Sequence, residues 1–145
     1  MCIRDSAASY SELATTYRKL KQPQEALRNY ALALRYDPKL TQAYNGMGVL
    51  YFEQKNYREA LQQFSQAVRL NALDVTALRN LGSCYLLLKD GRNAADAFGR
   101  ALRINPNDAV VLQYMGFAYE DMGNRAEANV YFEKARQAQT AGKAQ

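Results

Sequence analysis

Four tyrosines lie 34 residues apart along the chain, with no insertion or deletion between them. Five more columns keep the same step: a Leu or Met and a small residue before each tyrosine, then an alanine, an aromatic residue and a second alanine after it. The columns are Leu13/Met47/Leu81/Met115, Ala14/Gly48/Gly82/Gly116, Tyr17/Tyr51/Tyr85/Tyr119, Ala26/Ala60/Ala94/Ala128, Tyr30/Phe64/Phe98/Phe132 and Ala33/Ala67/Ala101/Ala135. Six columns in phase predict that the chain is built from one repeated structural unit.

Each repeat contains two stretches in which apolar residues recur at intervals of three and four, which is helical spacing. Turn-forming residues such as Lys55-Asn56 separate the two stretches, and Asp37-Pro38 and Asn105-Pro106 separate repeats, because a proline stops a helix at its predecessor. The pattern predicts eight helices. The first helices of the repeats (A helices) are expected at 7–20, 41–54, 75–88 and 109–122, and the second (B helices) at 24–36, 57–70, 91–104 and 125–138.

The third repeat reads Leu78-x2-Leu81-Gly82-x2-Tyr85, then Ala94-x3-Phe98 and Pro106, and it resembles the tetratricopeptide repeat, a helix-turn-helix unit of this length. The resemblance implies an all-α fold, a right-handed α-solenoid (superhelix) with the A helices on its concave side. One domain over 7–142 is expected, with repeats 7–40, 41–74, 75–108 and 109–142 and a tail at 143–145.

The small column Ala14/Gly48/Gly82/Gly116 is predicted to let each B helix lie close against its A helix, with the aromatic column filling the space beside it. Burial of one aromatic ring contributes about 1.5–3 kcal/mol. A glycine inside a helix costs about 1 kcal/mol. Packing therefore outweighs the lower helix propensity of glycine.

The two ends of the chain differ from the repeats. Residues 1–6 resemble the translation of a sequencing adapter, so we expect a non-native leader and a metagenomic fragment; a native irregular N-terminus is the alternative. A signal peptide, lipid anchor or further repeats upstream would then be lost. The last helix carries Asn129, Arg136 and Ala138 in columns that are apolar earlier, which favours a solvent-facing terminal repeat and an array ending near Gln139.

The A-helix residues outside the core columns vary between repeats and are predicted to line the concave groove. Amides and hydroxyls there can bond an extended backbone, and apolar residues can take side chains. The predicted site consists of Gln42, Asn45, Val49, Phe52, Thr76, Arg79, Asn80, Ser83, Leu86, Val110, Gln113, Phe117 and Glu120. The alternative for Phe52, Leu86 and Phe117 is packing against neighbouring A helices or against a C-terminal segment that folds back.

One version of the fold grips the carboxylate tail of heat-shock chaperones with lysine, arginine and asparagine at set groove positions. Only Asn80 matches that clamp, after a shift of one repeat, so a chaperone-tail adaptor is disfavoured. The asparagine ladder of the sugar-transferring relatives is likewise reduced to Asn80.

The net charge of +5 and the pI of about 9.2 raise the question of nucleic-acid binding. Arg35, Arg69 and Arg103 form a column near the C-terminal ends of B helices, where a cation meets the negative end of the helix dipole, so they are interpreted as structural. No basic face interleaved with aromatic residues is predicted, which argues against nucleic acid as a partner.

Catalysis has little support. The chain has no histidine, and Cys84 is the only cysteine outside the leader and lies in a small-residue column, which predicts a buried structural thiol. There is no phosphate-binding loop after a strand. An enzyme, a metal site and a cofactor are therefore not expected, and no apolar run approaches the ~20 residues of a membrane span.

The sequence thus predicts a non-catalytic module that binds an extended peptide or a helix of a partner protein. Two alternatives remain: a fragment of a bacterial scaffold resembling pilus or secretion assembly factors, with permanent subunit contacts, and a regulatory domain of a truncated larger protein. Cytoplasmic and periplasmic locations, and all oligomeric states, stay open.

Overall fold

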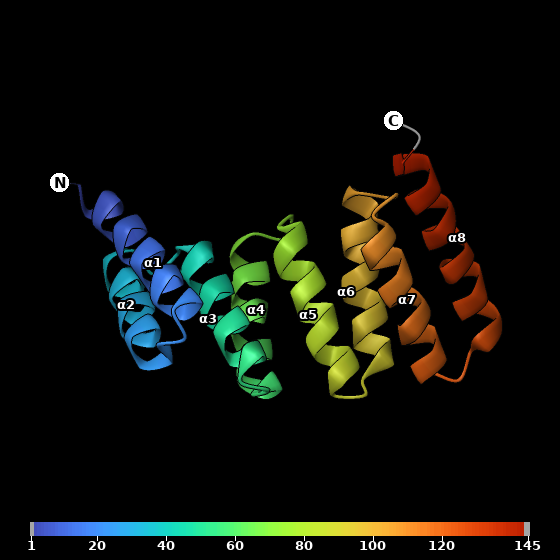
Figure 1. Ribbon diagram of the computed structural model, residues 1–145, viewed down its shortest axis with the longest axis horizontal. Coiled ribbons are helices and arrows are strands. Elements are labelled where there is room, and N and C mark those ends of the chain that lie inside the picture. The colour runs from blue at the N-terminus through green and yellow to red at the C-terminus, as the bar shows by residue number, and fades with distance from the viewer. Residues whose placement is uncertain (1, 144–145) are drawn as a thin grey trace. The chain divides into compact units, whose positions relative to one another are not determined.

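The computed structural model describes residues 2–143, and every regular element in that range is an α-helix (Figure 1). The A helices are α1 (Ile3–Lys19), α3 (Thr41–Glu53), α5 (Val75–Leu87) and α7 (Ala109–Asp121), and the B helices are α2 (Pro23–Tyr36), α4 (Tyr57–Leu70), α6 (Gly91–Ile104) and α8 (Arg125–Lys143). The predicted all-α helix-turn-helix repeat is confirmed.

The two outer helices are longer than predicted. Helix α1 begins at Ile3 instead of residue 7, and α8 runs to Lys143 instead of residue 138. Asp5 lies in the first turn of α1, where a carboxylate is favourable against the helix dipole. Neither extension contains a proline, so nothing in the local sequence stops the helix.

The chain divides into two compact units, residues 1–72 with α1–α4 and residues 73–145 with α5–α8. In the first unit α1 packs on α2, α2 on α3, and α3 on α4, while α1 also contacts α3. The second unit repeats this arrangement with α5–α8, and α5 contacts α7. Within each unit the two A helices are therefore neighbours.

In three repeats the ring of the B helix lies directly on the glycine of the A helix. A methyl group placed on Gly48 would lie 2.5 Å from the nearest ring carbon of Phe64, and one on Gly82 would lie 2.5 Å from Phe98. A methyl group on Gly116 would overlap Phe132 in the same way. The predicted pairing of the small and aromatic columns is thus observed, and it fixes the separation of each helix pair.

The first repeat packs differently, because Ala14 stands in the column where the other three repeats have glycine. The fully buried ring of Tyr30 leaves no room for a side chain at Gly46 on the next A helix. Its hydroxyl lies 3.0 Å from the hydroxyl of Thr15. In the second unit the position equivalent to Gly46 is Tyr114, whose ring lies 5.7 Å from that of Phe98.

The turn from A helix to B helix has the same geometry in all four repeats. Lys21, Lys55, Lys89 and Gly123 adopt left-handed backbone with φ of 60°, 62°, 62° and 77°. The next residue donates its N–H to the carbonyl of the tyrosine that recurs every 34 residues, as in Asn56 N to Tyr51 O at 2.9 Å. This helix end, which is closed by two backbone hydrogen bonds, is a Schellman motif. Glycine adopts its left-handed backbone with the least strain.

A first prediction concerns this strained lysine. Lys55→Gly should raise the free energy of unfolding by about 0.5–1 kcal/mol, because a side chain in left-handed backbone is strained. Urea denaturation measures the change. Gln54→Gly, one residue earlier at φ −82°, is the matched control and should lower stability. Equal losses in both variants would show that the left-handed strain is negligible.

A second prediction separates two glycines on neighbouring helices. Gly82→Ala should lower the free energy of unfolding by about 1–3 kcal/mol, because the new methyl group meets the Phe98 ring. Gly99→Ala should be neutral or stabilising, since its methyl group would lie 3.6 Å from Met115 and alanine favours helix. Thermal melting followed by circular dichroism compares them. Equal melting temperatures would contradict the ring-on-glycine packing.

Candidate partner-binding surface

The thirteen residues predicted to contact a partner are called here the A-helix surface. Four lie on α3 in the first unit, and nine lie on α5 and α7 in the second. None is buried. Gln42, Thr76, Val110, Gln113, Phe117 and Glu120 are exposed, and Asn45, Val49, Phe52, Arg79, Asn80, Ser83 and Leu86 are partly exposed.

On α3 the surface combines an aromatic ring with polar neighbours. The ring of Phe52 packs edge-to-face against Tyr57 at the start of α4, with centroids 5.3 Å apart. Phe52 is therefore held by the helix-helix turn while part of it remains accessible. Val49 lies one turn earlier, and Gln42 is exposed in the first turn.

On α5 and α7 the surface carries its most accessible apolar residues. Val110 is 43% exposed and Phe117 is 41% exposed. The covered part of the Phe117 ring packs edge-to-face on Phe132, with centroids 5.2 Å apart. The neighbouring helix contributes Leu86, and Ser83 donates its hydroxyl proton to the carbonyl of Arg79 at 3.0 Å.

Arg79 brings a positive charge to this part of the surface. Among residues 2–143 no carboxylate oxygen lies within 4.0 Å of its guanidinium. The side chain is partly exposed and its position in α5 corresponds to Gln113 in α7. A partner carboxylate could pair with it without displacing an existing ion pair.

Asn80 belongs to a column that behaves differently from the rest of the surface. The residues at the same position in the second and fourth repeats, Gly46 and Tyr114, both pack on the B-helix ring of the preceding repeat. That column is shared between the core and the accessible face. This distinguishes Asn80 from residues such as Gln113, which is exposed.

Polar contacts tie the C-terminal ends of A helices to neighbouring segments. Arg18 of α1 donates to Glu53 of α3 at 2.5 Å. At the end of α7, Asp121 accepts from the backbone N–H of Gly91, the first residue of α6, at 3.0 Å and lies 3.8 Å from the ammonium of Lys89 in the turn between α5 and α6. The first pair therefore joins the two A helices of its unit, whereas the contacts of Asp121 join α7 to the turn that precedes α6.

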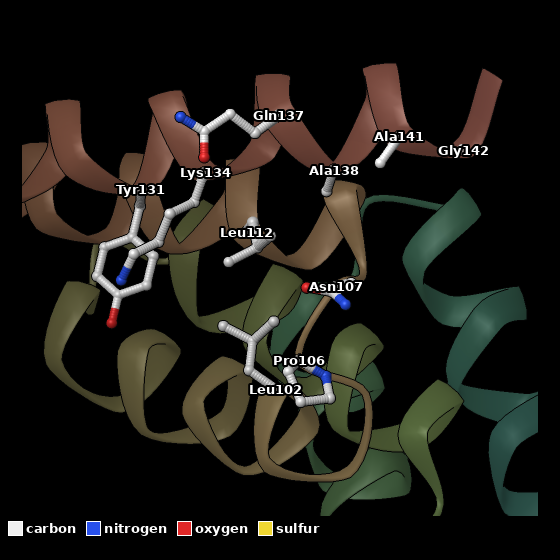
Figure 2. Close-up of a pocket in the computed structure, with 10 residues that line it drawn as sticks. All are labelled: Leu102, Pro106, Asn107, Leu112, Tyr131, Lys134, Gln137, Ala138, Ala141 and Gly142. Carbon is white, nitrogen blue, oxygen red and sulfur yellow. The ribbon is translucent and has the colours of Figure 1, made fainter. Parts of the chain in front are cut away.

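The sequence interpretation missed a cavity in the second unit that shares no lining residue with the A-helix surface. It is bounded by α6, α7 and α8 and has a volume of about 770 Å³ (Figure 2). A smaller hollow of about 440 Å³ is lined by Glu120, Gly123 and Arg125 at the turn between α7 and α8. The sequence feature that could have indicated the larger cavity is Ala138, because earlier repeats carry the larger residues Tyr36, Leu70 and Ile104 at its position.

Cys84 is fully buried, and burial raises the pKa of its thiol to about 12. Within residues 2–143, no group of three or more Cys, Asp or Glu side chains is placed to hold a metal ion. No helix in the same range combines the length and the apolar character needed to cross a membrane.

Comparison with known proteins identifies the family to which the repeats are similar. Three sequence profiles, each described as tetratricopeptide repeat, match residues 5–72, 47–109 and 111–138. A comparison with curated protein sequences gave no significant match.

Solved structures with a similar fold match almost the whole chain. A crystal structure of MamA is similar with a TM-score of 0.89 at 25% sequence identity, over 96% of this chain and 81% of that protein. A second MamA crystal structure gives 0.84 at 26% identity, over 92% and 73% of the two chains. PilF of Pseudomonas aeruginosa gives 0.81 at 27% identity, over 92% of this chain and 61% of its own.

A third prediction tests the chemical state of Cys84. At neutral pH a maleimide should label only the exposed Cys2 of the folded chain, because the Cys84 thiol is both buried and protonated. Mass spectrometry should find one label in buffer and two in urea. A Cys2→Ser variant should take no label until it is unfolded; rapid labelling of that variant in buffer would show that Cys84 is accessible.

Proposed function

Because the chain belongs to the tetratricopeptide repeat family, we propose that it is a non-catalytic interaction module that binds a segment of a partner protein on the A-helix surface. Repeats of this family are protein-protein interaction modules and are typically non-catalytic. The partner segment would be an extended peptide or a helix. Its contacts would come from side chains that vary between repeats, because those are not needed for the core.

The observation that carries the proposal is the exposure of apolar side chains next to polar ones on α5 and α7. Phe117 and Val110 each expose more than two fifths of their surface. Gln113 and Arg79 lie on the same two helices, and these helices contact each other. An aromatic anchor surrounded by groups that form hydrogen bonds is the usual composition of a protein interface.

The mixture also favours a particular type of segment. The guanidinium of Arg79 can donate hydrogen bonds to a carboxylate, and Phe117 with Leu86 can contact an apolar side chain. An extended peptide of about ten residues, at about 3.3 Å each, would present side chains alternately to such points. We therefore expect partner sequences that combine acidic and bulky apolar residues.

A second candidate function is that of a scaffold subunit that stays permanently bound in a larger assembly. The similarity to MamA and PilF over at least 92% of this chain supports it. The two candidates differ in kinetics: a peptide captured reversibly exchanges with free peptide, whereas a permanent subunit does not. Competition with an excess of unlabelled peptide distinguishes them.

A fourth prediction tests the A-helix surface with one substitution. Ten-residue peptides would be selected from a random library against the purified chain, and the tightest one synthesised with a fluorescent label. Phe117→Ala should weaken its binding about 5- to 30-fold, as expected for removal of an aromatic anchor. Fluorescence polarisation measures the Kd, and circular dichroism should show the same helix content, since Phe117 is partly exposed and its ring makes an edge-to-face contact with Phe132.

Val130→Ala is the matched control. Val130 is 44% exposed, much like Phe117, but it lies on α8 outside the A-helix surface. This variant should bind the peptide as the unmodified chain does. If Phe117→Ala and Val130→Ala weaken binding equally, or if neither does, the peptide binds elsewhere and the A-helix surface is not the site.

A further inference from the structure

The cavity between α6, α7 and α8 lies within the second unit and is separate from the A-helix surface (Figure 2). Its volume of about 770 Å³ falls in the range of sites that bind small ligands or a few residues of a peptide. Its walls come from the end of α6 and the following loop, from α7, and from the second half of α8. The lining residues are Leu102, Pro106, Asn107, Leu112, Tyr131, Lys134, Gln137, Ala138, Ala141 and Gly142.

Two columns of the repeat carry smaller residues at the cavity than they do in the first repeat. In the first repeat these columns hold Tyr10 and Tyr36, whose rings stack with centroids 5.5 Å apart and an interplanar angle of 9°. In the fourth repeat they hold Leu112 and Ala138, both of which line the cavity. A packed aromatic pair is thus replaced by an open space with an apolar floor.

Among the described residues that line the cavity, Lys134 is the only charged one. Its ammonium lies 4.8 Å from the centroid of the Tyr131 ring, which in turn stacks on Tyr119 at 5.4 Å. Among residues 2–143 no carboxylate oxygen lies within 4.0 Å of this ammonium. Figure 2 shows the ammonium held beside the ring at one end of the cavity. An anion could therefore bind to a cation that is already positioned.

The acidic residue that precedes Lys134 on α8 is engaged elsewhere. Glu133 accepts two bonds from Arg136, at 2.8 and 3.0 Å, and one from the amide nitrogen of Gln137 at 2.9 Å. The bonds from Arg136, followed by that from Gln137, lower the pKa of the Glu133 carboxyl. Its negative charge is therefore neutralised by Arg136 instead of Lys134.

Two side-chain amides complete the lining. Gln137 uses its nitrogen for Glu133, which leaves its carbonyl oxygen as an acceptor, and Asn107 supplies a second amide from the loop after α6. A peptide backbone offers one N–H donor and one C=O acceptor per residue and can bond both amides. A hydrocarbon chain with a carboxylate could not, so a peptide fits this lining better than a fatty acid.

We propose that this cavity is a second binding site, which takes the apolar C-terminal end of a polypeptide with its terminal carboxylate on Lys134. The apolar side chain would lie against Leu112, Leu102 and Ala138, and the backbone would bond to Asn107 and Gln137. The proposal goes beyond the A-helix surface and does not depend on it.

The experiment uses the full chain and two synthetic probes, N-acetyl-Ala-Val-Leu with a free carboxylate and the same tripeptide as the C-terminal amide. Titrations followed by ¹⁵N–¹H correlation spectra report the affinity and the residues that shift. We expect shifts within 102–112 and 131–142, and about fivefold weaker binding of the amide, as for the loss of a solvent-accessible ion pair.

Three variants make the assignment specific. Lys134→Gln should bind the acid and the amide equally. Ala138→Ile restores the residue type of the third repeat and should weaken both probes by about tenfold or more, because it fills the cavity, while the melting temperature stays the same or rises. Lys143→Gln, on the same helix but outside the lining, should bind as the unmodified chain does.

The outcomes separate this site from the A-helix surface. Equal binding of acid and amide by the unmodified chain, no binding of either, or unchanged binding by Ala138→Ile would overturn the proposal. So would decanoate that binds in the cavity when the tripeptide does not, since that indicates a fatty-acid site. Shifts confined to α5 and the exposed face of α7 would assign the tripeptide to the A-helix surface and also reject the cavity.

Discussion

The contact between a B-helix ring and an A-helix glycine sets the geometry on which the other features depend. In the repeats with Phe64, Phe98 and Phe132 the ring occupies the space of a missing side chain, so the two helices can approach only when that column is glycine. The next residue along the A helix is rotated by about 100° and reaches the edge of this contact. Phe117, directly after Gly116, therefore makes an edge-to-face contact with Phe132 and remains 41% exposed. The packing of the core thus determines which side chains of the A helix are accessible.

The sequence was sufficient to predict the repeat, the eight helices and the ring-on-glycine pairing, because the step of 34 keeps every core column in register. The turns were also predictable, although the left-handed backbone at Lys21, Lys55 and Lys89 was not, since glycine fills that position only in the last repeat. The ends of α1 and α8 were placed too close to the repeats. Those ends depend on the absence of a helix-stopping residue, and an absence is a weak signal.

The accessible face was predictable only as a set of columns. Periodicity identifies which positions leave the core, and all thirteen residues are at least partly exposed. It does not reveal what each side chain touches, as the contacts of Phe52 with Tyr57 and of Phe117 with Phe132 show. It also does not show that Gly46 and Tyr114, which stand in the same column as Asn80, pack on the ring of the preceding B helix. These contacts depend on the size of residues in other columns, and one column read by itself does not contain that information.

Cavities in a repeat protein arise where the sizes of residues in paired columns no longer match. Across the repeats, a change of size in one column is often matched in its partner: the large Tyr30 meets Gly46, whereas the smaller Phe98 meets Tyr114. The packing is then preserved although both residues differ. Between Tyr10/Tyr36 and Leu112/Ala138 both columns become smaller, and the result is an open space bounded by Lys134 and two amides. Unmatched losses of volume in paired columns are therefore the places to look for binding sites in such an array, because the framework elsewhere remains closely packed.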